Sequence, residues 1–315
     1  MGCGKVLVTG GAGFIGSHLT EELVREGFEV TVLDDLSTGR AENLSGCSKN
    51  AKVSFILGDI RKKAVTDDAI SHHTNAIFHL AAKASVPYSV EHPKVTHEVN
   101  VNGTRNLLET CVHKGVGKLI YASSASVYGD PEYLPIDESH PFKPLSPYAK
   151  SKLKAEQICK EFEEVYGLKI TILRPFNVYG PRQRNDQYSG VITKFIKQLK
   201  QRKPPIIYGD GSQTRDFIHV SDVVRAFILA YKSNAAIGRI FNVATGVPTP
   251  INNLANLLQD LLKAEGIKPL HEAPREEDIE HSYAEIEQAK TFLGFEPRIT
   301  LKEGLASLLE APEND

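Results

Sequence analysis

A glycine-rich stretch near the amino terminus places the strongest constraint on how this chain can fold. Residues 9–16 read Thr-Gly-Gly-Ala-Gly-Phe-Ile-Gly, directly after a short β-branched run and at the start of a segment with helical periodicity. Gly10 permits a tight turn, Gly13 permits close approach of the backbone to a pyrophosphate, and Gly16 permits close packing of the helix on the strand. Because a helix amino terminus attracts anions, the stretch predicts a strand–loop–helix unit that binds a diphosphate.

Strand-like and helix-like segments continue to alternate through the first 180 residues. Strands are predicted at residues 5–9, 29–33, 53–57, 76–80, 118–122 and 169–173, and helices at 17–26, 61–71, 95–114 and 151–166. Strands that are apolar on both sides and alternate with helices are typical of a parallel sheet covered on both faces. The predicted fold class is therefore α/β, with a Rossmann-type doubly wound parallel sheet and a smaller C-terminal α/β substrate-binding lobe.

The length of 315 residues is near the size at which one hydrophobic core begins to divide into two. After Arg174 the regular alternation gives way to Pro- and Gly-rich segments at 179–182 and 203–205. We therefore expect a dinucleotide-binding domain at residues 1–180 and a substrate-binding lobe at 181–315, with the possibility that the chain crosses back between them.

The charge balance argues against several classes of partner. Lys and Arg number 37 against 39 Asp and Glu, with no long run of one sign, so no nucleic-acid partner is expected. The apolar runs are far shorter than the roughly 20 residues that span a bilayer, so no membrane association is expected. A strand that begins by residue 5 leaves no room for a secretory signal, and we expect a cytoplasmic protein. The four cysteines lack C-x-x-C spacing, so no metal site is predicted.

Two acidic residues, Asp34 and Asp35, end the second predicted strand about 20 residues after the glycine-rich stretch. A carboxylate at this position would hold the adenosine ribose hydroxyls of a dinucleotide and repel the extra phosphate of NADP, so the predicted cofactor is NAD. Arg40 is close enough in sequence to leave NADP as an alternative. The cofactor-binding residues predicted in these two segments are Gly10, Gly13, Phe14, Ile15, Gly16, Asp34, Asp35, Leu36, Ser37, Thr38 and Gly39.

Tyr148 and Lys152 form a candidate catalytic pair at the start of a predicted helix, where their i, i+4 spacing puts both on one side. A tyrosine that acts as a base in the cell must have its pKa lowered by about 3 units, or about 4 kcal/mol. One ammonium at about 6 Å supplies roughly 2 to 3 kcal/mol, and the positive nicotinamide ring of an oxidised cofactor could supply the rest. Ser124 follows another parallel strand at the same edge of the sheet and could hydrogen-bond the reacting hydroxyl.

Taken together, these motifs resemble the extended short-chain dehydrogenase/reductase family, and within it the nucleotide-sugar 4-epimerases. The resemblance spans almost the whole chain. The matching segments are residues 9–16, 59–60, 79–82, 100–103, 123–124, 148–152, 174–181, 211–216 and 275–278.

The resemblance implies roles for residues outside the glycine-rich stretch. Asp59 and Ile60 would hold the adenine, and Phe176 would lie near the nicotinamide. The middle of the cofactor would be lined by Leu80, Ala81, Ala82, Lys83 and Asn100, with Tyr148 and Lys152 also in contact with it. A sugar nucleotide would be held by Ser124, Tyr148, Asn177, Val191, Lys194, Tyr208, Arg215, Arg275, Asp278 and Ser282. Arginines in this set suit a diphosphate because they make fork-shaped, charge-assisted contacts.

The resemblance also frames the reaction. Relatives that eliminate water look as though they need an acid just after the serine that contacts the hydroxyl, but Ala125 and Ser126 stand there, so the reaction should stop at reversible oxidation of C4. A small residue, Ser282, stands where the epimerases have a gate beside the C2 substituent. We therefore expect UDP-GlcNAc/UDP-GalNAc to be accepted as well as UDP-glucose/UDP-galactose.

Three further expectations stay open from the sequence. UDP-glucuronate is an alternative substrate, because nothing in the sequence discriminates a carboxylate at C6. A protein that senses NAD without catalysis is a second alternative, although intact Ser124, Tyr148 and Lys152 argue against it. Finally, the helices at 95–114 and 151–166 resemble those that form a helix bundle in family dimers, so we expect a homodimer.

Overall fold

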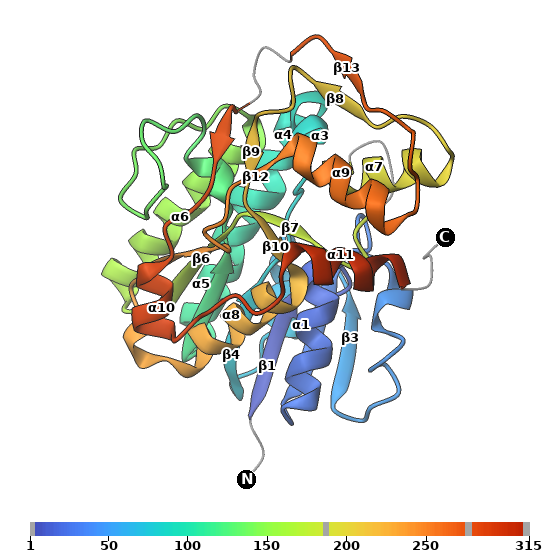
Figure 1. Cartoon of the computed structure of the whole chain (residues 1–315). Helices are drawn as coiled ribbons and strands as arrows, with labels where there is room; N and C mark the ends of the chain where they lie inside the picture. The colour runs from blue at the N-terminus through green and yellow to red at the C-terminus, as the bar shows by residue number, and fades with distance from the viewer. Residues whose placement is uncertain (1–3, 185–188, 275–278, 311–315) are drawn as a thin grey trace.

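Seven parallel strands form the central sheet of this chain, whose computed structural model describes residues 4–184, 189–274 and 279–310 (Figure 1). The strand order is β11-β6-β5-β4-β1-β2-β3. The bounds are β1 (Lys5–Thr9), β2 (Glu29–Asp34), β3 (Val53–Leu57), β4 (Thr74–His79), β5 (Lys118–Ala122), β6 (Ile170–Pro175) and β11 (Ile240–Val243). The predicted doubly wound sheet is confirmed, and the order reverses between β1 and β4, where such sheets bind ligands.

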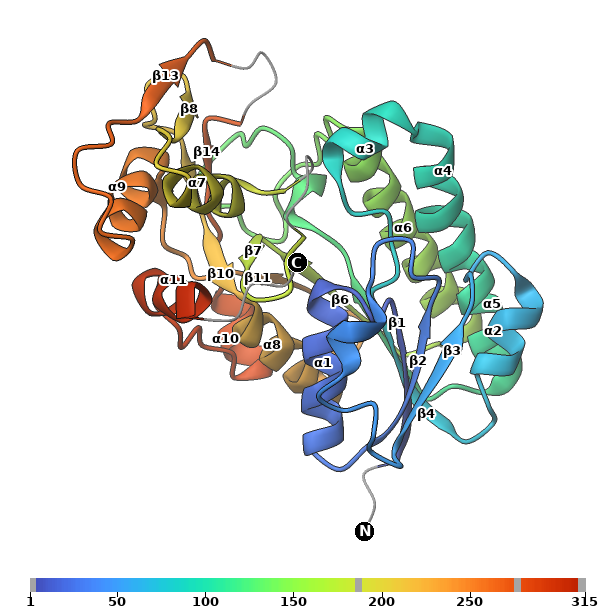
Figure 2. The same ribbon diagram turned by 90° about the vertical axis from the view of Figure 1, so that its right-hand side faces the viewer.

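Helices cover both faces of the sheet because successive strand residues point to opposite sides. Val6 and Val8 of β1 pack in one buried cluster with α1 (Phe14–Arg25), α8 (Val220–Lys232) and α10 (Glu287–Leu293). Leu7 packs in a second cluster with the helices of the other face. Those helices are α2 (Lys63–Ala69), α5 (Thr104–Lys114) and α6 (Pro147–Tyr166), with α3 (Val86–Glu91) and α4 (Pro93–His97) packed on α6. Figure 2 shows the two helical layers on either side of the sheet.

All four predicted helices differ from their observed bounds, and two of them differ for identifiable local reasons. The helix expected at 95–114 is α4, a π-helical turn at Glu98–Gly103, and α5 in succession. The helix expected from residue 151 begins at Pro147, because the Ser146 hydroxyl caps it by accepting a hydrogen bond from the Ala149 N–H at 3.1 Å. Proline at the first helical position needs no N–H partner, which favours this earlier start.

A smaller layer packs beside the carboxyl edge of the sheet. It contains α7 (Val191–Lys200), α9 (Ile251–Leu261) and α11 (Leu301–Glu310), whose buried residues share a core of their own. Short strands accompany them: β7 (Asn177–Tyr179) with β10 (Phe217–His219), β8 (Ile206–Tyr208) with β13 (Leu270–Glu272), and β9 (Thr214–Arg215) between β12 (Thr249–Pro250) and β14 (His281–Ser282). The chain crosses back after β10, since α8 and β11 join the large sheet.

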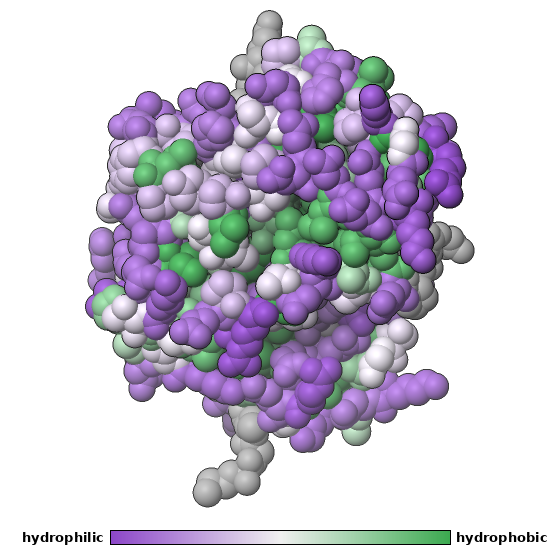
Figure 3. Space-filling view, in the orientation of Figure 1, coloured by the Kyte–Doolittle hydropathy of each residue, from purple (hydrophilic) through white to green (hydrophobic). Residues whose placement is uncertain are grey.

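The surface is predominantly polar. In Figure 3 hydrophilic residues cover most of one face, while hydrophobic residues gather in a hollow at its centre. No helix within the described ranges is long and apolar enough to cross a bilayer. Cys47, Cys111 and Cys159 are buried free thiols, and the described residues contain no His/Cys/Asp/Glu group that could hold a metal ion.

Lys118, the first residue of β5, connects this strand to α8, which lies about 100 residues later in the sequence. Its side chain is buried, and Nζ donates to the carbonyl oxygens of Ala230 at 2.8 Å, Tyr231 at 2.9 Å and Ser233 at 2.7 Å. The Ala230 and Tyr231 carbonyls belong to the last turn of α8 and Ser233 is its C-cap, where the negative end of the helix dipole favours a cation. One ammonium therefore satisfies three carbonyl groups that the helix itself leaves without partners.

Replacing this lysine should measure the strength of that junction. Lys118→Met keeps the apolar stem but removes three charge-assisted hydrogen bonds, and we expect the free energy of unfolding to fall by about 2 to 4 kcal/mol. Urea unfolding followed by circular dichroism measures the change. Lys52→Met is the matched control, since the exposed Lys52 donates to the Gly27 carbonyl at 3.1 Å, and its loss should cost under about 0.5 kcal/mol. Equal losses in the two variants would contradict this account of Lys118.

Candidate active site

The predicted cofactor residues gather at the carboxyl edge of the large sheet. Gly10 follows β1, Asp34 ends β2, Leu80 follows β4 and Ser123 follows β5. Parallel strands bring these ends together, although the residues are far apart in sequence. The seven-stranded sheet thus collects the glycine-rich loop, the acidic pair and the serine segment along one edge.

The glycine-rich loop has the geometry that its sequence predicts. Gly10 has φ +70°, and a Cβ there would lie 2.7 Å from the Ala81 nitrogen. A Cβ at Gly16 would lie 2.1 Å from the Gly10 oxygen, so α1 packs tightly on the loop. At Gly13, the N-cap of α1, a Cβ would meet only the Gly10 oxygen, at 3.1 Å. Packing alone therefore hardly requires glycine at 13, and the open space before a helix amino terminus fits a diphosphate.

Asp34 lies directly beside this loop. Its two carboxylate oxygens accept hydrogen bonds from the N–H of Ala12 at 3.0 Å and of Leu36 at 2.8 Å. Burial raises the pKa of Asp34, and these two hydrogen bonds oppose that shift. Asp35 is exposed and instead accepts from the Ser37 N–H at 2.9 Å. Of the two acids, Asp34 is the one held in a fixed position next to the predicted diphosphate site.

The segment after Asp34 returns to the glycine-rich loop. The Arg40 N–H donates to the Ala12 carbonyl at 3.0 Å, and a Cβ at Gly39 would lie 2.8 Å from the backbone of Ala12. The exposed Arg40 side chain therefore begins near Asp34, as the NADP alternative supposes. Thr38 is exposed on the same segment. Asp34, the predicted ribose ligand, and Arg40, the residue that leaves NADP as an alternative, therefore lie on one short segment.

Asn100 connects the cofactor edge to the catalytic helix. It is buried in the π-helical turn between α4 and α5, a local geometry frequent at functional sites. Its Oδ1 accepts from the Lys83 N–H at 2.8 Å, and its Nδ2 donates to the Ser151 hydroxyl at 2.9 Å. Ser151 in turn donates to the Tyr148 carbonyl at 2.7 Å. Ser151 was not predicted; its place between Tyr148 and Lys152 was the only sequence signal for it.

Asp59 and Ile60, predicted beside the adenine, have protein partners. The Asp59 carboxylate accepts from the Arg61 guanidinium, with Nη2 at 2.6 Å, which lowers the pKa of Asp59. Ile60 is buried in the core, and a Cβ at Gly103 would lie 2.7 Å from its Cδ1. Any adenine contact must therefore share the Asp59 carboxylate with Arg61 or use the backbone of these two residues.

The catalytic candidates Ser124, Tyr148 and Lys152 are brought together. Burial raises the pKa of Tyr148, and a hydrogen bond with the Ser124 side chain lowers it. Burial also lowers the pKa of Lys152 to about 8, and its Nζ donates to the Ala122 carbonyl at 2.7 Å. Ser124 Oγ is oriented by the Ser126 N–H at 3.2 Å. Because Tyr148 is buried, the pKa shift needed to form a phenolate is larger than the about 3 units expected for an exposed tyrosine.

A buried ion pair that the sequence did not reveal lies behind the serine segment. Arg174 binds both carboxylate oxygens of Glu156, with Nε–Oε1 at 2.9 Å and Nη2–Oε2 at 2.7 Å. The Ser123 hydroxyl donates to the same carboxylate, and Arg174 Nη1 donates to the Tyr128 hydroxyl at 2.8 Å. Glu156 stands one turn beyond Lys152 on α6, and this spacing was the available signal.

The smaller layer brings two predicted substrate residues side by side. Ser282 of β14 is the register partner of Arg215 of β9. Asn177 lies at the start of β7, and its Nδ2 donates to the Asp216 carbonyl at 3.2 Å. Val191 and Lys194 lie on the first turn of α7, Tyr208 ends β8, and Phe176 is buried just after β6. Arg275 and Asp278 lie outside the described residues.

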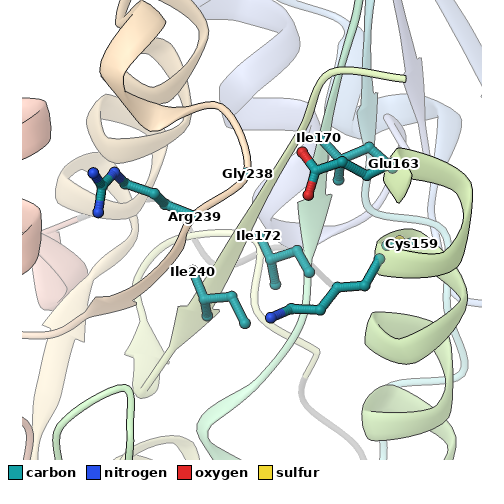
Figure 4. Close-up of a pocket in the computed structure, with 8 residues that line it drawn as sticks. Cys159, Glu163, Ile170, Ile172, Gly238, Arg239 and Ile240 are labelled. Atoms are coloured by element: carbon teal, nitrogen blue, oxygen red, sulfur yellow. The ribbon is translucent and has the colours of Figure 1, made fainter. Parts of the chain in front are cut away.

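One pocket of the structure is excluded as the ligand site. Figure 4 shows it between α6, β6 and β11, lined by Cys159, Lys160, Glu163, Ile170, Ile172, Gly238, Arg239 and Ile240. Ile170 and Ile240 are the first residues of their strands, so the pocket lies at the amino edge of the sheet. It contains none of the predicted site residues and lies opposite the edge where open α/β sheets bind ligands.

Comparison with known proteins agrees with this geometry. The model of the NAD dependent epimerase/dehydratase family matches residues 6–244. A UDP-glucose 4-epimerase of Mycolicibacterium smegmatis is 40% identical, covering 97% of this chain and 97% of its own.

Two solved structures extend the comparison. A UDP-glucose 4-epimerase of Thermotoga maritima with UDP-glucose is 38% identical, with a TM-score of 0.91 over 97% of each chain. A UDP-N-acetylglucosamine 4-epimerase of Methanobrevibacter ruminantium, in complex with UDP-N-acetylmuramic acid, is 38% identical, with a TM-score of 0.93 over 98% of each chain. The likeness therefore covers both layers of the molecule.

The role of Asp34 can be tested through retention of NAD. Asp34→Asn replaces one acceptor oxygen with an NH₂ group facing a backbone N–H, so we expect NAD affinity to fall about 10- to 100-fold. Calorimetric titration of protein stripped of cofactor measures the affinity. Asp35→Asn should lower NAD affinity less, because that side chain is exposed. Asp68→Asn, on the exposed side of α2, makes the same chemical change away from the site and is the control. A larger loss at Asp35 than at Asp34 would reverse the assignment.

Proposed function

The chain belongs to the NAD dependent epimerase/dehydratase family, and we propose that it reversibly inverts C4 of a UDP-sugar through a 4-keto intermediate. The observation that carries this proposal is the buried Tyr148, beside Ser124 and one helical turn before Lys152, at the carboxyl edge of a Rossmann-type sheet. Relatives at about this level of identity that act on UDP-glucose and UDP-N-acetylglucosamine support it.

The residues at the carboxyl edge fit an NAD cofactor that is retained through the cycle. The open space beside Gly13, at the amino terminus of α1, would hold its diphosphate, and Asp34 would hold its adenosine ribose. When bound, NAD supplies an acceptor for the hydride that C4 loses and a donor that returns it. Because hydride leaves and returns in the same cycle, no net cofactor is consumed.

The protein's own task in this cycle is to move one proton. Tyr148 as phenolate accepts the proton of the sugar 4-hydroxyl, directly or through Ser124, and later returns it to the opposite epimer. Burial opposes the phenolate, whereas the Ser124 hydrogen bond and the neighbouring Lys152 ammonium favour it. Arg215 would anchor the sugar nucleotide's diphosphate, so that the 4-keto sugar can turn and present its other face.

No acidic side chain stands directly after Ser124, where elimination would need one. Ala125 and Ser126 have no acidic proton to donate at C5 or C6. The Glu156 carboxylate is held by Arg174 and Ser123. Glu138 Oε1 accepts from the Asn242 N–H at 2.7 Å, and its Oε2 is buried without a hydrogen-bond partner among the described residues. This arrangement favours epimerisation over the dehydratase chemistry that other members of the family carry out.

Ser282 supports acceptance of an N-acetyl group at C2. It is small, half-buried and paired in register with Arg215, so it lies beside the arginine assigned to the diphosphate. Ser126 would offer a polar group that the sequence did not suggest, since its hydroxyl oxygen is buried without a hydrogen-bond partner among the described residues. That hydroxyl suits either a hydroxyl or a carboxylate at C6, so UDP-glucuronate belongs in the substrate tests.

A homodimer through α5 and α6 is part of the proposal. Val112, Val165 and Tyr166 are exposed apolar side chains on these two helices, with Tyr166 57% exposed. Arg105 of α5 lies over the Phe162 ring of α6 at 5.8 Å, so the helices already pack as one layer. A second copy that covers this layer would complete a helix bundle.

Tyr148→Phe tests the catalytic assignment. Loss of the phenolic oxygen removes the proton acceptor but not the ring packing, so we expect turnover of UDP-glucose to fall at least about 100-fold while the melting temperature and NAD content are retained. A coupled assay of UDP-galactose formation measures turnover, and absorbance after release of bound cofactor measures NAD. Undiminished turnover would exclude Tyr148 as the base; a wild-type protein that binds NAD and turns over no UDP-sugar would support the sensing alternative instead.

Ser282→Tyr tests the substrate assignment. A bulky ring beside the C2 substituent should lower kcat/KM for UDP-GlcNAc by about 100-fold or more, while kcat/KM for UDP-glucose changes by less than about fivefold. Assays of both enzymes with UDP-glucose, UDP-GlcNAc and UDP-glucuronate provide the comparison, with UDP-glucose as the internal control. Equal losses on all substrates would show that position 282 does not face C2, and turnover of UDP-glucuronate alone would replace the proposed substrate.

A further inference from the structure

An aromatic ring lies against the lysine of the proposed catalytic pair. Lys152 Nζ lies over the Tyr121 ring, 5.0 Å from its centroid, which is within the range of a cation–π interaction. Tyr121 is 1% exposed and Lys152 is 3% exposed, so solvent does not weaken the contact. The residue after Tyr121, Ala122, provides the carbonyl that accepts from Nζ at 2.7 Å. The end of β5 thus contacts the ammonium through both a carbonyl oxygen and a ring.

The carboxylate that favours this ammonium, Glu156, is shared with a second cation. Glu156, the nearest acid on α6, has both oxygens bound by Arg174 of β6. Burial raises the pKa of the Cys159 thiol, also on α6, so it is neutral. His79 of β4 has its pKa lowered to about 3 by burial and by Lys152, so it adds no positive charge at neutral pH. Tyr148, on α6 one turn before Lys152, carries negative charge only as the phenolate that begins the proposed cycle.

We propose that the ring of Tyr121 keeps Lys152 protonated and in place, and that Tyr121 is therefore a positioning residue for proton transfer at Tyr148. The negative face of the ring attracts the ammonium and offsets part of the free energy lost when the charge is removed from water. This inference rests on the proposed function for its catalytic consequence. Its physical core, the stabilisation of one buried ammonium by one ring, can be measured without turnover.

The ring rather than the hydroxyl carries this role. Tyr121 Oη is buried and has no hydrogen-bond partner among the described residues, so it contributes an unsatisfied polar group. The ring is held by His79, whose centroid lies 5.5 Å away. His79 is itself fixed by the hydroxyls of Thr9 at 2.7 Å and Thr104 at 2.9 Å. Contacts therefore run from the glycine-rich loop, through two rings, to the lysine.

Substitutions at position 121 that change the ring charge but not its size test the proposal. Phenylalanine, 3,5-difluorophenylalanine and 3,4,5-trifluorophenylalanine make the ring face progressively less negative. Burial already lowers the pKa of Lys152 to about 8, and a weaker ring lowers it further. The ammonium is then lost at lower pH, so the alkaline limb of the kcat–pH profile should move down by about 0.5 to 1.5 pH units across the series. Tyr121→Phe should keep that limb in place.

Two controls separate this role from simple packing. Leu119→Val shortens a buried side chain on the same strand and the same face of the sheet, and it should lower the melting temperature without moving the alkaline limb. Tyr121→Leu removes the ring and should shift the limb at least as far as trifluorophenylalanine. The proposal is overturned if kcat falls equally at every pH and the alkaline limb stays in place through the fluorinated series. This outcome can be read even if Tyr121→Leu fails to fold.

A direct titration distinguishes failure of this inference from failure of the proposed function. The ¹³Cε resonance of Lys152, assigned by comparison with Lys152→Arg, reports its protonation in the protein as purified, without sugar substrate. We expect its midpoint to fall in the order Phe, difluoro, trifluoro. If the wild-type protein turns over no UDP-sugar, the titration still decides the inference; an unchanged midpoint across the series overturns it whatever the activity.

Discussion

The attachment of helix α6 to the ends of β5 and β6 is the constraint on which the site depends. Lys152 Nζ donates to the Ala122 carbonyl, and Glu156 binds Arg174 with both oxygens. The two contacts are one helical turn apart, so they fix both the rotation and the height of the helix. Tyr148 lies one turn before Lys152, and its phenol therefore arrives beside Ser124. Breaking the buried pair would leave an uncompensated charge under this arrangement.

Burial opposes the charged forms of both Tyr148 and Lys152. It raises the pKa of Tyr148 and lowers the pKa of Lys152 to about 8, so both groups are pushed toward their neutral forms. The proposed proton transfer requires both charged forms, a Tyr148 phenolate and a Lys152 ammonium. The Ser124 hydrogen bond, the Ala122 carbonyl and the Tyr121 ring oppose these shifts from three directions. In this family the site is completed by a cofactor whose oxidised ring carries positive charge.

The residues proposed for catalysis and for substrate selection lie on different layers of the molecule. The large sheet carries the glycine-rich loop, Asp34 and the catalytic helix. The smaller layer carries Arg215 and Ser282, which are adjacent because two short strands pair in register. Since α8 and β11 return to the large sheet after β10, the layers are joined by several crossings and not by a single linker. Under the proposed function, substitutions in the smaller layer would alter substrate choice without displacing Tyr148 or Lys152.

The sequence by itself determined the α/β class, the strand–loop–helix unit around Gly10 and the acid that ends β2, because these depend on local periodicity and on glycine spacing. It also supplied Tyr148 and Lys152, because i, i+4 spacing on a helix is a local property. Only the tertiary structure decided which of Asp34 and Asp35 is fixed beside the loop. It alone revealed Arg174 on Glu156 and Tyr121 under Lys152, because each contact joins separate strands and helices. Such contacts follow from strand order and helix packing, which short-range sequence patterns do not encode.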